Sequence, residues 1–74
     1  MLALDASSII HAWDNYPEKQ FPPLWNWISD NIASGEFVMA QVAFEEVKKK
    51  APDCATFLKN AELTQIKINN AIAQ

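Results

Sequence analysis

The chain has 74 residues, 50% of them hydrophobic, and a formal charge of −3 from six lysines, no arginine and nine acids. This balance excludes an autonomous nucleic-acid-binding protein that relies on a broad basic surface. A chain of this length buries only about 60% of its unfolded surface, so it would be marginally stable as a lone domain. We therefore expect the first part of a larger α/β domain, or a chain whose exposed core is covered by a partner.

Targeting and cysteine content point to an intracellular location. The apolar runs are only a few residues long and no basic region precedes them, which indicates neither an export signal nor a membrane span. The single cysteine, Cys54, cannot form an internal disulfide and lacks the ligand spacing of a zinc site. We expect a small buried thiol in the reducing cytoplasm.

The first strand is predicted over residues 2–5, where a short uncharged run ends at Asp5. Ser7 or Ser8 is expected to cap a helix that ends near residues 15–17. Apolar residues recur in this helix at helical spacing, namely Ile9, Ile10 and Trp13.

The second helix is predicted to start at Pro22-Pro23, because proline suits a first helical turn. Ser34-Gly35 should end it, since glycine adopts the left-handed conformation cheaply. Its apolar stripe consists of Leu24, Trp25, Trp27, Ile28 and Ile32.

A buried strand over residues 36–40 and a helix over residues 41–50 should follow. Three lysines in the last turn of that helix, Lys48–Lys50, suit the helix dipole. Asp53 is expected to cap a fourth helix that buries Phe57 and Leu58.

The last segment has two interpretations. Residues 64–68 alternate like a strand, whereas Leu63, Ile66 and Ala71 fit a helix equally well. With the strand, the order of elements predicts an α/β fold with a short parallel sheet of about three strands and crossover helices.

Two carboxylates, those of Asp5 and Glu46, are the candidate site residues. Asp5 ends the first strand, and Glu46 lies on the helix after the second strand. Parallel strands bring such positions to one edge of the sheet, where α/β proteins bind ligands. Mg²⁺ or Mn²⁺ can be bound there by one or two carboxylates plus substrate phosphate.

The run Leu4-Asp5-Ala6-Ser7-Ser8-Ile9-Ile10 resembles the opening motif of PIN domains. Glu45-Glu46-Val47 resembles the glutamate and aliphatic residue of the family's later helix. The block Phe21–Trp27 and the Ser34-Gly35 break are similar to a bacterial PIN-like subfamily. The resemblance covers residues 1–68 and implies a partial three-layer PIN-like fold, with residues 1–74 as the N-terminal portion of one domain.

This resemblance implies a metal-dependent endoribonuclease, often the toxin component of a toxin–antitoxin pair. Asp5 would be the first metal ligand and catalytic acid, Ser7 the hydroxyl that steadies it, and Glu46 the second acid, with Glu45 as the fallback. The family's further acids follow the third strand and lie beyond Gln74, so the chain is expected to be truncated and inactive without them. The alternative is a non-catalytic PIN-like remnant or interaction module.

Each candidate residue also has a structural interpretation. Asp5 can cap the helix that follows it, and Glu46 can pair with Lys50 one turn away. Ser7 and His11 are one turn apart, as in some hydrolases, yet no nucleophile-elbow motif accompanies them.

The aromatic residues and lysines suggest core and surface rather than a binding site. At helical spacing, Trp13, Trp25, Trp27 and the phenylalanines are expected in the core, and Lys48–Lys50 on a solvated helix end or against phosphate. Without a second half, part of the apolar surface would stay uncovered, which predicts self-association or an antitoxin-like partner.

Overall fold

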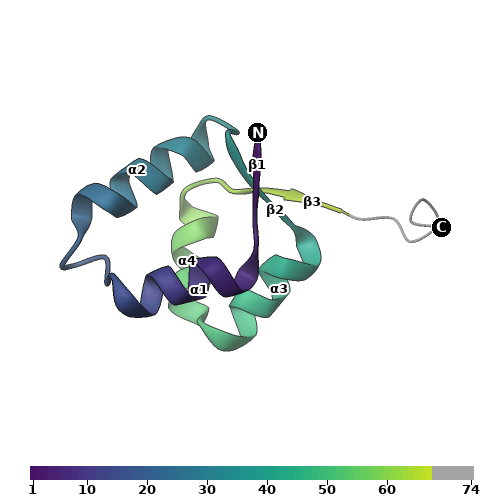
Figure 1. The fold of residues 1–74 in the computed structure, drawn as a ribbon. Helices are drawn as coiled ribbons and strands as arrows, with labels where there is room; N and C mark the ends of the chain where they lie inside the picture. Colours follow the sequence, from purple (N-terminus) through teal and green to yellow (C-terminus); the bar gives the residue numbers. More distant parts are fainter. Residues whose placement is uncertain (68–74) are drawn as a thin grey trace.

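A three-stranded parallel sheet in the order β1-β2-β3 is the frame of the protein, with two helices after β1 and two after β2 (Figure 1). The computed structural model describes residues 1–67. The elements are β1 (Leu2–Leu4), α1 (Ala6–Asn15), α2 (Pro22–Ala33), β2 (Phe37–Ala40), α3 (Gln41–Lys50), α4 (Pro52–Asn60) and β3 (Thr64–Ile66). This confirms the predicted α/β fold with a parallel sheet and crossover helices.

The start of α1 confirms one of the two predicted caps, Asp5, and not the other, Ser7 or Ser8. The strand ends at Leu4, and Asp5 is the N-cap, with extended backbone and a side chain that accepts a hydrogen bond from the Ser8 N–H. Ser7 and Ser8 lie inside the first turn instead. Aspartate is as good an N-cap as serine. Asp5 is the cap because it lies directly before the first helical residue.

α2 begins at Pro22 and ends at Ala33, as its proline and glycine signals predict. Gly35 has a φ of 84°, the left-handed conformation that favours glycine. One face of α2 is buried through Trp25, Ile28 and Ile32. Trp27 lies mostly outside this stripe, because 57% of the residue is exposed.

β2 is the most buried strand of the sheet. Phe37, Val38 and Met39 are all buried, and Met39 is fully enclosed. Phe37 and Met39 face the helices and join the core residues of α1, α2, α3 and α4, including Ile9, Ile32, Phe44, Val47, Cys54 and Leu58. The strand therefore acts as the central support of the fold.

The break between α3 and α4 lies where the sequence places it, but Asp53 is not the cap. The cap position is Ala51, which makes no side-chain cap hydrogen bond. Because Pro52 needs no N–H partner, the helix starts there. Asp53 falls in the first turn, where its charge favours the helix dipole.

The last described strand confirms the strand interpretation over Thr64–Ile66, where Thr64 pairs with Val38 in parallel. Ile68 and Ala71, which the two interpretations also used, lie outside the described residues. Nothing in residues 1–67 supports the helical alternative for this segment.

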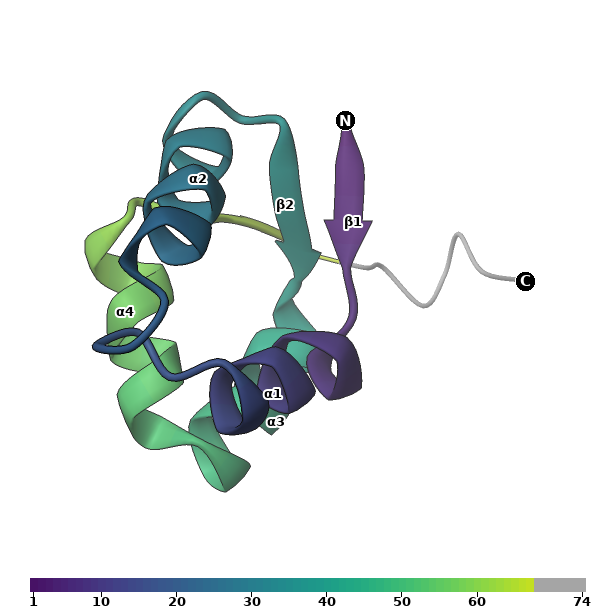
Figure 2. The ribbon, with the colours of Figure 1, turned by 60° about the vertical axis from the view of Figure 1, so that its left-hand side comes forward.

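The four helices lie on one side of the sheet (Figures 1 and 2). Residues 1–67 thus form one sheet with one helical layer on it. None of the helices in this range is long and apolar enough to cross a bilayer.

Candidate functional site

The carboxyl ends of β1 and β2 meet at one edge of the sheet, where α1 and α3 begin (Figure 2). Leu4 pairs with Met39, so Asp5 follows β1 beside the end of β2, whose last residue is Ala40. α1 then packs against α3. The topology therefore brings the helix capped by Asp5 next to the helix that carries Glu46.

The carboxylate of Asp5 is exposed and held by two hydrogen bonds to one of its oxygens. Oδ1 accepts from the main-chain N–H of Ser8 at 2.7 Å and from the hydroxyl of Ser7 at 3.0 Å. The pKa of Asp5 is lowered below its ordinary value of 3.8, mainly by the main-chain bond from Ser8 and then by the side chains of Ser8 and Ser7. Neither bond engages Oδ2. Asp5 is thus an ionised, fixed carboxylate with one oxygen directed elsewhere.

An open hollow of about 420 Å³ lies beside Asp5, lined by Ser7, Ser8 and His11. In the sequence, the one signal at His11 is its spacing of one helical turn from Ser7. Nδ1 of His11 lies 3.2 Å from the side-chain nitrogen of Asn15, and the Ser7 hydroxyl donates to Asp5. Ser7 is therefore not aligned with His11 as a hydrolase nucleophile.

Glu46 is exposed on α3 and paired with a lysine. Its Oε2 lies 3.1 Å from Nζ of Lys50, which confirms the ion pair expected from their spacing. Glu45 pairs in the same way with Lys48 at 3.4 Å. Glu46 is also five residues into α3, roughly 7–8 Å along the helix from its first residue. A ligand at the Asp5 edge must therefore draw Glu46 away from Lys50.

The described residues do not form a metal cage by themselves. Among residues 1–67, no group of three or more His, Cys, Asp or Glu side chains is placed to hold a metal ion. Mg²⁺ commonly binds one or two carboxylates and completes its shell with water and substrate phosphate. Binding of that kind needs fewer protein ligands than a metal cage does.

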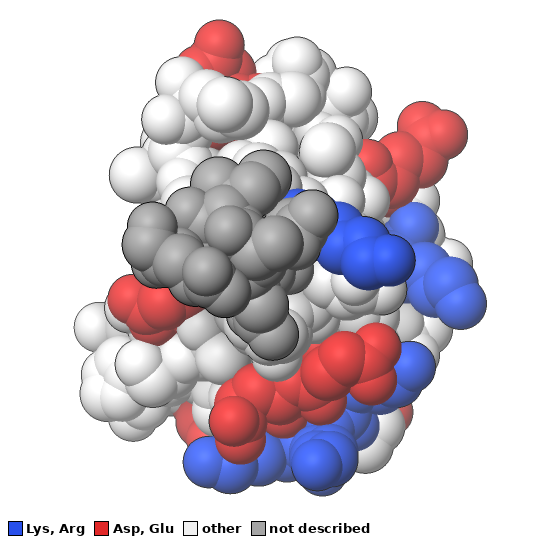
Figure 3. All heavy atoms as spheres, turned by 90° about the vertical axis from the view of Figure 1, so that its right-hand side faces the viewer, with Lys and Arg blue, Asp and Glu red and all other residues white. Residues whose placement is uncertain are grey.

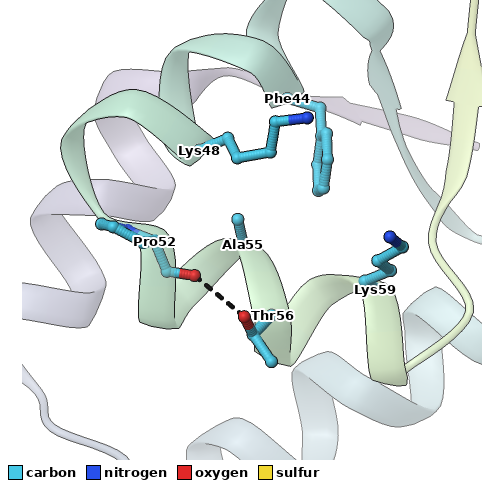
Figure 4. Close-up of a pocket in the computed structure, with 6 residues that line it drawn as sticks. All are labelled: Phe44, Lys48, Pro52, Ala55, Thr56 and Lys59. Atoms are coloured by element: carbon cyan, nitrogen blue, oxygen red, sulfur yellow. Dashed lines mark hydrogen bonds between the residues drawn. The ribbon is translucent and has the colours of Figure 1, made fainter.

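The lysines in the last turn of α3 follow two glutamates, and Lys48 and Lys50 pair with them. Figure 3 shows lysine and acidic side chains side by side on this face of the molecule rather than a separate basic area. A hollow of about 190 Å³ between α3 and α4 has Lys48 and Lys59 on opposite sides, with Phe44 and Ala55 between them (Figure 4). Phe44 is buried, so its ring supports the wall of the hollow.

Cys54 is fully buried, as predicted, and it has no features of a reactive thiol. Burial, with a smaller effect of the Asp14 charge, raises the pKa of its thiol to about 12. A thiol that stays protonated is a poor nucleophile and a poor metal ligand. Cys54 is therefore a core residue.

Comparison with known proteins gives one match. The family model described as "Domain of unknown function (DUF4411)" matches residues 2–73, nearly the whole chain. No curated protein and no solved structure matches this chain.

Proposed function

The chain belongs to the DUF4411 family, and we propose that it is the N-terminal portion of a PIN-like, divalent-metal-dependent endoribonuclease. Asp5 is the first metal ligand, Glu46 the second, and Ser7 positions Asp5. The ion is Mg²⁺ or Mn²⁺ and the substrate is RNA.

One observation carries this proposal: the geometry of Asp5 at the carboxyl edge of a parallel sheet. This edge is where α/β proteins bind ligands. The carboxylate there is exposed, and its Oδ1 accepts hydrogen bonds from Ser7 and Ser8. A ligand carboxylate fixed by outer hydrogen bonds loses less freedom when it binds an ion. The resemblance to PIN domains places the family's first acid at this residue.

In the proposed site the metal ion and the side chains have different roles. A bound ion would supply charge to neutralise a phosphodiester and would acidify a water. Ser7 holds one oxygen of Asp5, and Glu46 approaches from α3 once Lys50 releases it. The open hollow beside Asp5, lined by Ser7, Ser8 and His11, leaves room for a phosphate group.

The biological setting that the resemblance supports is a toxin–antitoxin pair in the cytoplasm. In that setting the partner is a small antitoxin-like protein. The PIN family also uses acids that follow the third strand, so the proposed activity includes a role for such acids beside Asp5 and Glu46.

The test is Mn²⁺ binding by calorimetry together with Mn²⁺-dependent cleavage of a labelled single-stranded RNA. We expect saturable binding that Asp5→Asn abolishes, and cleavage that falls to the metal-free background in the same variant. Asp14→Asn is the matched control, because Asp14 is an exposed acid on the same helix but away from the strand end. Ser7→Ala should weaken Mn²⁺ binding by about 10–100-fold.

A second candidate is a non-catalytic interaction module. Two observations favour it: Asp5 already serves as a helix cap, and Glu46 is already paired with Lys50. If Mn²⁺ does not bind saturably and Asp5→Asn leaves stability unchanged or higher at neutral pH, this candidate replaces the nuclease.

A further inference from the structure

The chain has one histidine, and it lies at the hollow beside Asp5. His11 lines this hollow of about 420 Å³ together with Ser7 and Ser8. Ser7, His11 and Asn15 are exposed and spaced four residues apart on α1, so they share one face of the helix. The face begins at the helix end that Asp5 caps. The one imidazole of the protein is therefore beside the proposed metal ligand.

The side chain of Asn15 determines which ring nitrogen of His11 carries the proton. Its Nδ2 donates to the main-chain carbonyl of His11 at 2.8 Å, so the amide atom at this position is the nitrogen and not the oxygen. The same nitrogen lies 3.2 Å from Nδ1 of His11. Because an amide nitrogen donates and does not accept, Nδ1 must be the unprotonated acceptor. In the neutral ring the proton is therefore on Nε2.

This tautomer leaves a free hydrogen-bond donor at the hollow. Within residues 1–67, the side-chain bonds at His11 are those with Asn15, and none of them involves Nε2. The two serines are engaged differently: the hydroxyl of Ser7 donates to Asp5, and a side-chain hydrogen bond from Ser8 also lowers the pKa of Asp5. Of the side chains that line the hollow in the described range, His11 therefore supplies the donor that is left for a ligand.

The chemistry of this donor selects the ligand. A metal ion binds an unprotonated imidazole nitrogen, whereas Nε2 carries a proton and Nδ1 is bonded to Asn15. The non-bridging oxygens of a phosphodiester only accept hydrogen bonds, so they match an N–H group. The negative charge of Asp5 repels a phosphate that arrives alone, and a divalent ion on Asp5 reverses that local charge. A phosphodiester at the proposed ion thus has a matching donor beside it.

We propose that His11 is a substrate-binding residue, which donates a hydrogen bond from Nε2 to a non-bridging phosphate oxygen of the RNA backbone. Asn15 is a positioning residue, which holds the ring of His11 in the required tautomer. This inference rests on the proposed nuclease function, because a phosphate approaches Asp5 only when an ion is bound there. A phosphate contact positions the strand and does not read its bases.

The first test is nitrogen-15 nuclear magnetic resonance of the imidazole in the metal-free chain, where the single histidine gives one pair of ring-nitrogen signals. When the ring is neutral, we expect the pattern of a proton on Nε2. Asn15→Ala should move this pattern toward a mixture of the two tautomers. Asn31→Ala is the matched control, because the Asn31 amide also donates at 2.8 Å to the carbonyl four residues earlier, that of Trp27, on a helix without histidine.

The second test is binding of a fluorescent six-nucleotide single-stranded RNA in Mg²⁺, measured by anisotropy, beside Mn²⁺ calorimetry on the same variants. His11→Ala should raise the RNA dissociation constant by about tenfold or more, because a hydrogen bond to a charged acceptor is lost. Its Mn²⁺ affinity should stay unchanged. Asn15→Ala should weaken RNA binding less than His11→Ala does, since the donor remains but is no longer held. Circular dichroism should show the same fold throughout, because both residues are exposed.

Two conservative variants separate the donor from the bulk of the ring. The amide nitrogen of His11→Gln lies about as far from the main chain as Nε2, so this variant should keep most of the RNA affinity. The amide of His11→Asn reaches only the position of Nδ1, so this variant should bind RNA as weakly as His11→Ala.

A proton on Nδ1 in the neutral wild-type ring overturns the proposal. So does weaker Mn²⁺ binding in His11→Ala, which would make His11 a metal ligand. Equal RNA affinity in wild type and His11→Ala overturns it as well, and if Mn²⁺ still binds through Asp5 the nuclease proposal stands without it. Absence of Mn²⁺ binding in the wild type overturns both proposals.

Discussion

β1 and β2 are neighbours in one parallel sheet, yet their surroundings differ sharply. β2 is buried along Phe37, Val38 and Met39. β1 has an exposed Leu2, a half-buried Leu4 and an exposed Asp5 directly after it. The contrast teaches that the two strands have different tasks in the account proposed above: β2 is held in the helical core, while the proposed ligand Asp5 follows the exposed strand β1.

An aromatic cluster on the helices belongs to the same core as β2. Trp25 is almost fully buried, and its ring meets Trp13 edge-on at 5.0 Å and Phe57 at 5.3 Å. Its indole N–H donates to the carbonyl of Tyr16, which satisfies the only polar atom of the ring. Trp27 instead packs edge-on against Phe37 and stays largely exposed.

The two tryptophans of α2 give the largest expected difference between the regions. Trp25→Ala should lower the free energy of unfolding by about 3–5 kcal/mol, which is a large part of the total for a small domain. Trp27→Ala should cost about 1 kcal/mol or less, since it loses one aromatic contact. Chemical denaturation at low protein concentration measures both. Equal losses of unfolding free energy in the two variants would contradict the difference between the buried core around Trp25 and the exposed surface at Trp27.

The capping carboxylate gives a pH-dependent difference. The folded pKa of Asp5 is lowered from 3.8, mainly by the Ser8 N–H, so its contribution to stability is present above that value. The contribution is lost as the pH falls below 3.8 and through the folded pKa. Asn caps a helix but does not titrate in this range. Thermal unfolding of wild type and Asp5→Asn should therefore converge as the pH falls through this window.

Asp14→Asn serves as the control for the loss of one negative charge. If the stability difference between wild type and Asp5→Asn stays constant from neutral pH to below 3.8, the hydrogen bonds to Asp5 do not favour its ionised form.

The smallest expected effects come from the two ion pairs of α3. Glu45→Gln and Glu46→Gln each remove one exposed pair with a lysine, and each should cost about 0.3–0.5 kcal/mol. Their effects on Mn²⁺ affinity should differ, because only Glu46 is a proposed ligand. Lys50→Gln should then tighten Mn²⁺ binding by freeing Glu46. Calorimetry that finds both glutamate variants equally weakened would contradict this assignment.

Most of the architecture follows from local signals in the sequence. The prolines at residues 22 and 52, the Ser34-Gly35 break and the uncharged strands predict the element order that the structure shows. The errors concern helix starts, where neighbouring residues compete for one role. Asp5 occupies the N-cap position of α1, where Ser7 or Ser8 was also expected. Ala51 occupies the N-cap position of α4, where Asp53 was expected. The position of an N-cap is set to within one or two residues, and the residue types alone do not determine it that finely.

The candidate site is less predictable than the fold. Asp5 could be found because it ends a strand, and its bond from Ser7 agrees with the steadying role given to that residue. The hollow that includes His11 required the structure, since a helix turn exposes a side chain only after its neighbours pack. The position of Glu46 relative to Asp5 depends on how α1 packs against α3, and spacing along the chain carries no such information.

The most direct test of the central claim is nuclear magnetic resonance during Mn²⁺ titration, because this ion broadens the signals of nearby nuclei. The account predicts saturable broadening of the amides of Ser7 and Ser8 together with those around Glu46, lost in both Asp5→Asn and Glu46→Gln. Broadening confined to one of the two places, or none that saturates, would show that the two carboxylates do not share an ion.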